Sequence, residues 1–200
     1  MEKRKSEMSK KEDIIGKIRA GKHMEYDMPD LSLLNATTFA DPVDEFRRMS
    51  KHSGADVVDA ADGDDINEIV RRAYPDAKAI ASNLDCVTIA NRNPDTVDEA
   101  QDLNGTDVAV VKGDLGVAEN GCVWIPQTMK ERAVCFIAEY LVIILKRSDI
   151  VSNMHEAYAR IKTNDYGYGC FISGPSKTAD IAQALVMGAQ AARGVTVVLV

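Results

Sequence analysis

Short apolar runs alternate along the chain with segments in which apolar residues recur at helical spacing. The apolar runs have the length and composition of strands and occupy residues 55–60, 77–82, 107–112, 121–125, 140–146, 169–173 and 195–200. The helical spacing is found at residues 1–20, 41–53, 65–74, 130–138, 149–162 and 178–187. This alternation predicts an α/β fold in which helices cover a largely parallel sheet.

Two of the expected helices have clear start signals. Asp41 precedes a proline in the first turn, and Asp65 stands three residues before Glu68, as in a capping box. Residues 21–37 show no period and form a linker after a charged first helix. We therefore divide the chain into an N-terminal helical arm with its linker, residues 1–37, and an α/β domain, residues 38–200.

Composition and charge argue against several classes of function. The chain has 200 residues, 46% of them hydrophobic, and a net charge of -7, which disfavours a nucleic-acid partner. The longest apolar block, 138–145, is too short to span a membrane, and residues 1–12 lack the apolar core of a secretory signal. The four cysteines do not have the spacing of metal ligands, so we expect no metal site and free thiols in the cytoplasm. They are Cys86, Cys122, Cys135 and Cys170.

The most informative segment for chemistry is the turn after the strand at 169–173. If a helix opens at Lys177, its first N–H groups attract an anion, and hydroxyl and ammonium groups beside them add donors. The expected ligand-binding residues of this turn are Ser173, Gly174, Ser176, Lys177 and Thr178. The alternative is an ordinary helix start in which Ser176 serves as the N-cap.

A second segment, residues 112–121, lies between two expected strands. Gly116 permits a close backbone approach, and Glu119 and Asn120 are polar groups that a ligand could contact. The alternative is a hairpin connection in which Asn120 and Gly121 supply the turn geometry, and the residues alone favour it.

The two segments together resemble a known family. Gly-Val-Ala-Glu-Asn-Gly at 116–121 ahead of a strand, and Ile-Ser-Gly-Pro-Ser-Lys-Thr-Ala-Asp-Ile at 172–181, are similar to motifs of the LUD-domain family, in particular its lactate utilization protein C (YkgG-type) members. The resemblance covers essentially the whole chain and is most secure over residues 108–200. It implies a three-layer αβα fold similar to the NagB, ribose-phosphate isomerase (RpiA) and CoA-transferase group.

The resemblance also implies a role as an accessory subunit of an iron–sulfur system that oxidises L-lactate to pyruvate. The implied partners are iron–sulfur proteins, with no cofactor in this chain itself. Anion binding at the SGPSKTAD turn, with Gly116, Glu119 and Asn120 opposite, completes this interpretation.

Two departures from the family pattern indicate a divergent relative with an altered ligand or altered partners. Members commonly have Gly-Val-His-Gly-Pro before the last strand, whereas residues 188–194 here lack the histidine and place Gln190 there. A neutral amide cannot replace imidazole as an acid, base or metal ligand. The usual threonine of the first motif is Asn120.

Other functions remain open on the residues. One is a stand-alone enzyme acting on a phosphorylated, CoA-type or folate-type substrate, with Glu119 as the best candidate catalytic residue. Another is a scaffold in which the apolar stripe Ile14, Ile15 and Ile18 packs on a partner or on a second copy in a homo-oligomer. The sequence assigns no catalytic residue beyond Glu119 as a candidate.

Overall fold

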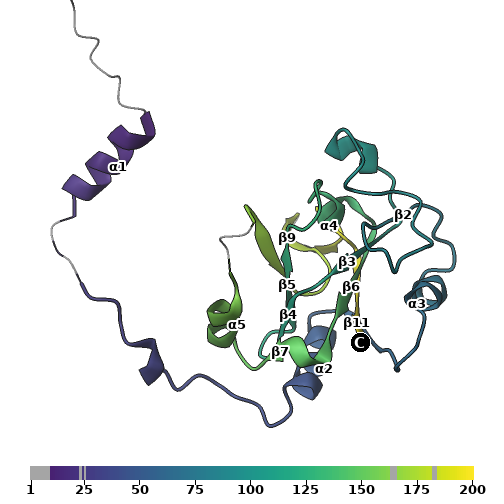
Figure 1. Ribbon diagram of the computed structural model, residues 1–200, viewed down its shortest axis with the longest axis horizontal. Helices are drawn as coiled ribbons and strands as arrows, with labels where there is room; N and C mark the ends of the chain where they lie inside the picture. The colour runs from purple at the N-terminus through teal and green to yellow at the C-terminus, as the bar shows by residue number, and fades with distance from the viewer. Residues whose placement is uncertain (1–9, 23, 25, 163–165, 182–183) are drawn as a thin grey trace, which may run out of the picture. The chain divides into compact units, whose positions relative to one another are not determined.

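The computed structural model describes residues 10–22, 24, 26–162, 166–181 and 184–200 (Figure 1). The chain forms two units, Met1–Asn35 and Ala36–Val200. The first unit contains helix α1, Lys10–Ala20, and the short 3-10 helix η1, Leu31–Leu33. No residue of α1 is buried, and Ile14 and Ile18 of the expected apolar stripe are exposed. Residues 1–9 of the expected first helix lie outside the described residues.

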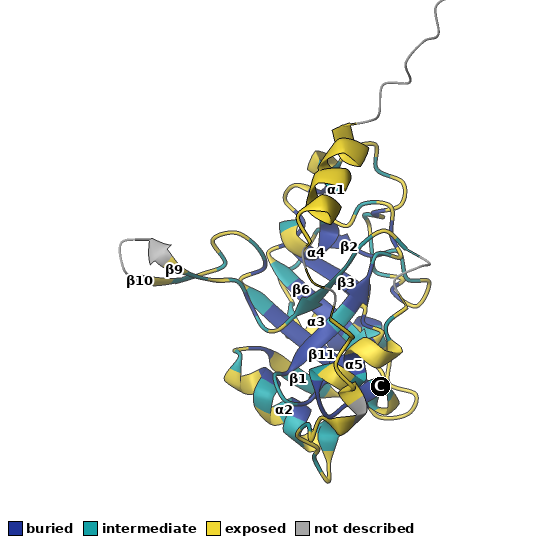
Figure 2. Cartoon of the chain, turned by 90° about the vertical axis from the view of Figure 1, so that its left-hand side faces the viewer, coloured by how far each residue is buried: buried dark blue, intermediate teal, exposed yellow. Residues whose placement is uncertain are grey.

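A five-stranded parallel sheet forms the centre of the second unit, in the order β1-β11-β6-β3-β2. Its strands are β1 Asp56–Asp59, β2 Ile80–Ala81, β3 Val108–Lys112, β6 Tyr140–Leu145 and β11 Gly194–Leu199. The middle strands are continuous apolar runs because both faces of a parallel sheet are covered. Their burial is visible in Figure 2. The expected α/β class with a mostly parallel sheet is confirmed.

Helices cover both faces of this sheet. On one face, Phe46 of α2, Pro42–His52, and Val134 of α4, Val134–Ile137, pack in one cluster with Leu141 and Ile143 of β6. On the other face, Ile69 and Val70 of α3, Ile66–Ala73, pack against alternate residues of the same strands. Asp41 and Asp65 cap α2 and α3 with their carboxylates, as the sequence predicts.

A second, four-stranded sheet lies beyond the first face, in the order β7-β4-β5-β8. Its strands are β4 Leu115–Val117, β5 Cys122–Pro126, β7 Ile150–Val151 and β8 Gly169–Ile172. Gly116 lets the two sheets approach, since a Cβ there would lie 2.7 Å from Leu145 Cδ2. Helix α5, Met154–Arg160, packs on this sheet through Ala157. The remaining short elements are the 3-10 helices η2 Ala100–Leu103 and η3 Arg147–Asp149.

The expected helix at 178–187 is wrong. The segment forms the antiparallel strands β9, Lys177–Ile181, and β10, Ala184–Met187, which extend away from the buried strands (Figure 2). The backbone N–H of Ser176 donates to the Ala192 carbonyl, and the Ser176 carbonyl accepts from Gly188 N, both at 2.9 Å. These bonds hold the two ends of the segment together, whereas a helix of ten residues would separate them by about 15 Å.

Other boundaries differ less. The expected helix at 149–162 begins at Met154, because the preceding residues form η3 and pair as β7 with β4. The expected helix at 130–138 is reduced to α4. In both places some residues whose apolar spacing predicts a helix form strand pairs or turns instead. Tertiary contacts override a weak helix propensity there.

We predict that an ion cluster at the end of β1 makes stability depend on acid pH. Arg47 Nη2 donates to Asp59 Oδ1 at 2.7 Å, and Arg147 Nη2 lies 3.3 Å from the same oxygen. Hydrogen bonding from Arg47 holds the pKa of Asp59 below its ordinary 3.8. The contribution to stability is therefore complete above that pH and disappears as the pH falls through the lower folded-state pKa.

Asp59→Asn should lower the thermal unfolding midpoint at pH 7 by about 1–3 °C, a small loss because exposed ion pairs contribute little. The difference from the wild type should shrink when the pH is lowered to about 3. Asp56→Asn, an exposed change on the same strand, is the control in calorimetry at both pH values. A difference that stays constant with pH would contradict this account.

Candidate functional site

The two motif segments meet at the C-terminal end of α2. Ser173 Oγ donates to the carbonyl of Asn120 at 2.9 Å and lies 3.0 Å from the Ser53 hydroxyl. Ser53 is the C-cap of α2. The structure therefore brings residues 119–121, residues 173–177 and the end of α2 into one place, which we call the motif junction.

Glycines make the backbones of the junction approach closely. A Cβ at Gly174 would lie 2.2 Å from the Ser53 carbonyl oxygen, and one at Gly121 would lie 2.5 Å from Ser50 N. Both glycines also have φ of +66°, a region that side chains disfavour. Steric contact and backbone conformation therefore both require glycine at these two positions.

Lys177 interacts with a helix end of the opposite polarity to the one expected. Its ammonium donates to the Ser53 carbonyl at the C-terminus of α2, where the helix dipole is negative. Because no helix begins at Lys177, the electrostatic argument for an anion at a helix N-terminus does not hold at this turn. Thr178 lies in β9 opposite Val186, and the Ser176 backbone is hydrogen-bonded to Gly188 and Ala192, which both follow β10.

The residues of the first motif have structural partners. Glu119 Oε1 accepts a hydrogen bond from Met154 N at 2.8 Å, so its carboxylate caps the start of α5. Asn120 Oδ1 accepts from Cys122 N at 3.1 Å, inside the antiparallel turn between β4 and β5. Gly116 is buried in β4. The hairpin interpretation of this segment is confirmed, and Glu119 is directed at α5.

A cavity of about 360 Å³ lies beside the second motif. Residues 173–176 form one side of it, and Cys135 and Gln190 contribute to the others. Burial raises the pKa of the Cys135 thiol to about 12, which leaves it protonated and a poor nucleophile near neutral pH. Within the described residues, neither the Ser176 hydroxyl nor the Gln190 amide has a side-chain hydrogen bond.

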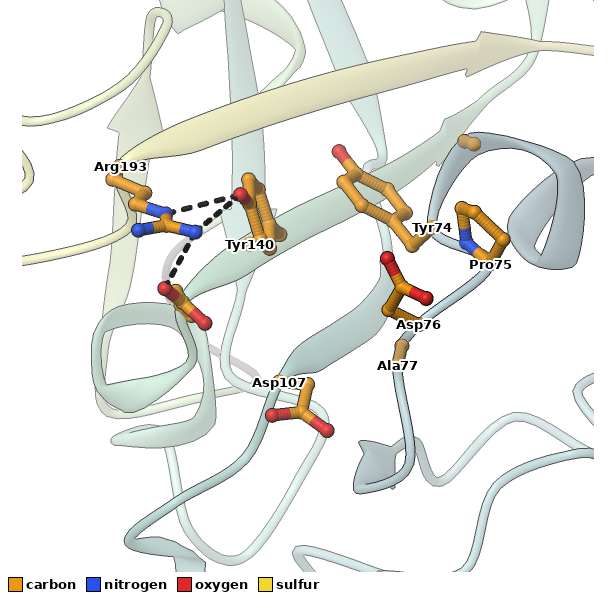
Figure 3. A pocket seen from close by; sticks show the side chains of 9 residues that line it. Tyr74, Pro75, Asp76, Ala77, Asp107, Tyr140 and Arg193 are labelled. Carbon is orange, nitrogen blue, oxygen red and sulfur yellow. Dashed lines mark hydrogen bonds and ion pairs between the residues drawn. The ribbon is translucent and has the colours of Figure 1, made fainter.

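A second pocket of about 360 Å³ opens at the amino edge of the central sheet (Figure 3). Arg193 donates to the Tyr140 hydroxyl at 2.7 Å through Nη2 and forms an ion pair with Glu139 at 2.8 Å. Asp107 accepts from the backbone of Lys78 and Ala79, which lowers its pKa. Most charged groups of this pocket are thus paired with one another or with backbone.

Sequence reasoning missed the contribution of α2 to the junction. Ser50, Ser53 and Gly54 carry no recognisable motif, and their contacts lie far away in sequence. Ser53 and Ser173 are 120 residues apart. The only local signal is the glycine that ends α2, which is an ordinary helix-stop signal.

Neither a metal site nor a membrane helix is found in the part of the chain that the structure describes. No three His, Cys, Asp or Glu side chains there are grouped so as to hold a metal ion. None of the described helices is long and apolar enough to cross a membrane.

Known proteins share the fold and one of the domains of this chain. The central sheet and the motif junction define an α/β protein whose fold matches that of a DUF162 family protein from Deinococcus radiodurans. That crystal structure superimposes with a TM-score of 0.63 at 12% identity, over 82% of this chain and 99% of the other. The family model for the LUD domain matches residues 95–200. The chain belongs to the LUD domain family.

One curated relative carries a functional name. Lactate utilization protein C from Shouchella clausii (strain KSM-K16) is 33% identical over 103 residues. The match covers 48% of this chain and 44% of that relative, so the chain spans less than half of its length. The resemblance expected from the two motifs is thereby confirmed at the level of the family.

The close contact at Gly174 gives a testable prediction. Gly174→Ala should destabilise the protein by about 1–2 kcal/mol for the left-handed backbone and by about 1–3 kcal/mol more for the clash with Ser53. Gly105→Ala is the matched control, because Gly105 has φ of +71° and a Cβ there would have no heavy atom within 4 Å. Urea unfolding should show a clearly larger loss for Gly174→Ala, and equal losses would refute the contact.

Proposed function

We propose that this LUD-domain protein is an accessory subunit of an iron–sulfur system that oxidises L-lactate to pyruvate. Support comes from the match to a lactate utilization protein C and from the meeting of both motifs at one junction. The match to lactate utilization protein C is the observation that carries the proposal, and the junction adds that the two motif segments of this family meet in the fold. In this proposal the iron–sulfur clusters belong to the partner proteins, and this chain acts in the cytoplasm.

Growth of the source organism tests this role. Deletion of the gene should abolish growth on L-lactate while leaving growth on pyruvate, the product of the oxidation, unchanged. A wild-type copy should restore growth on L-lactate. Growth on L-lactate that survives deletion, or equal loss on both carbon sources, would overturn the proposal.

Glu119→Gln distinguishes this role from that of a stand-alone enzyme. The amide keeps an oxygen that accepts from Met154 N, so the variant should fold and restore growth on L-lactate. A variant with an unchanged unfolding midpoint that fails to restore growth would instead favour Glu119 as a catalytic residue.

We further propose that a small anion binds in the cavity beside the SGPSKTAD turn. The Ser176 hydroxyl and the Gln190 amide, which have no side-chain partner among the described residues, both line the cavity and would donate to a carboxylate. The family histidine is replaced here by Gln190, so this residue is the natural one to vary.

Thermal shift with L-lactate, pyruvate and phosphate tests the anion site. A ligand at 100 times its dissociation constant adds about 2.7 kcal/mol, a rise of several degrees for a chain of this size. Gln190→Ala should abolish the rise, and Gln101→Ala, an exposed glutamine in η2, should retain it. No rise with any of the three anions, or an equal rise in both variants, would exclude the site.

A further inference from the structure

A third cavity, of about 460 Å³, lies at the carboxyl end of β3. It is bounded by Lys112 at the end of that strand, by Trp124 of β5 and by residues 160–162, which begin with the last residue of α5. It shares no lining residue with the cavity beside the motif junction. Ligands of α/β proteins bind outside the carboxyl ends of parallel strands, which is the position of this cavity.

The charge of this cavity is opposite to that of the chain. The chain has a net charge of -7, yet among the lining residues that the structure describes Lys112, Arg160 and Lys162 outnumber Asp114 and Asp149. Lys112 Nζ lies 3.3 Å from Asp114 Oδ1. Within the ranges that the structure describes, Arg160 and Lys162 form neither an ion pair nor a side-chain hydrogen bond.

An aromatic wall closes one side. The indole N–H of Trp124 donates to the Tyr166 hydroxyl at 3.1 Å, and the Trp124 ring lies 4.8 Å from that of Phe171. The indole is thus held by a hydrogen bond on one side and by ring packing on the other. Trp124 and Tyr166 both line the cavity and so offer an aromatic contact to a planar ring.

We propose that this cavity binds a mononucleotide. Arg160 and Lys162 would bind the phosphate, for which unpaired basic side chains are suited, and the Trp124–Tyr166 wall would contact the base. The carboxylates of Asp114 and Asp149 would repel a phosphate, but they would accept hydrogen bonds from the ribose hydroxyls. The volume falls in the range of small-molecule sites. This inference does not depend on the proposed role in lactate oxidation.

Trp124 is the single tryptophan of the chain and reports directly on the cavity. Titration of the full-length protein with AMP and with UMP should change its fluorescence saturably for at least one of them. Lys162→Gln should weaken that binding about tenfold, since a charged hydrogen bond is lost. Lys162 is preferred to Arg160 because it lies beyond α5, whose C-terminus a basic residue also stabilises.

Lys78→Gln is the matched control, because this exposed lysine lies next to Asp107 at the other end of β3. Binding that weakens in Lys162→Gln and not in Lys78→Gln supports the site. Absence of a saturable change with both nucleotides, or equal affinity in both variants, overturns it. Adenosine and inorganic phosphate, titrated separately, should each bind more weakly than AMP, and equal affinity for phosphate alone would refute the contribution of the base.

Discussion

The contact between the backbone at Gly174 and the Ser53 carbonyl is the constraint on which the motif region depends. A Cβ at residue 174 would overlap that carbonyl oxygen, so the turn can pack against the end of α2 only if residue 174 is glycine. Once it is seated, the Ser173 hydroxyl reaches Asn120 and the Lys177 ammonium reaches the end of α2. Three segments distant in sequence are thereby fixed together by backbone geometry, and their side-chain contacts follow from it.

The strands of the central sheet were predictable because buried strands consist mainly of apolar residues. Residues 108–111, 141–143 and 197–199 are apolar at every position and buried, and they pack into clusters on both faces of the sheet. The starts of α2 and α3 were predictable from Asp41 and Asp65, whose capping is local. The short strands β4 and β7 were not, because two or three residues carry too little pattern to separate a strand from a turn.

The hairpin and the candidate site were only partly predictable. Residues 178–187 have helical spacing, and the bonds of Ser176 to Gly188 and Ala192 that favour a hairpin cannot be read from that spacing. The two motifs identify residues that do meet, such as Asn120 and Ser173. Their partners on α2 and the capping of α5 by Glu119 depend on folding of the whole domain, which a single sequence does not reveal.

The closed base of the β9–β10 hairpin has a consequence for variation among related chains. Since Ser176 binds Gly188 and Ala192 across the base, β11 begins at the same place whatever lies between. Substitution or a change of length within residues 178–187 is therefore uncoupled from the central sheet. Related chains can therefore differ in the sequence and length of this hairpin while keeping the same central sheet.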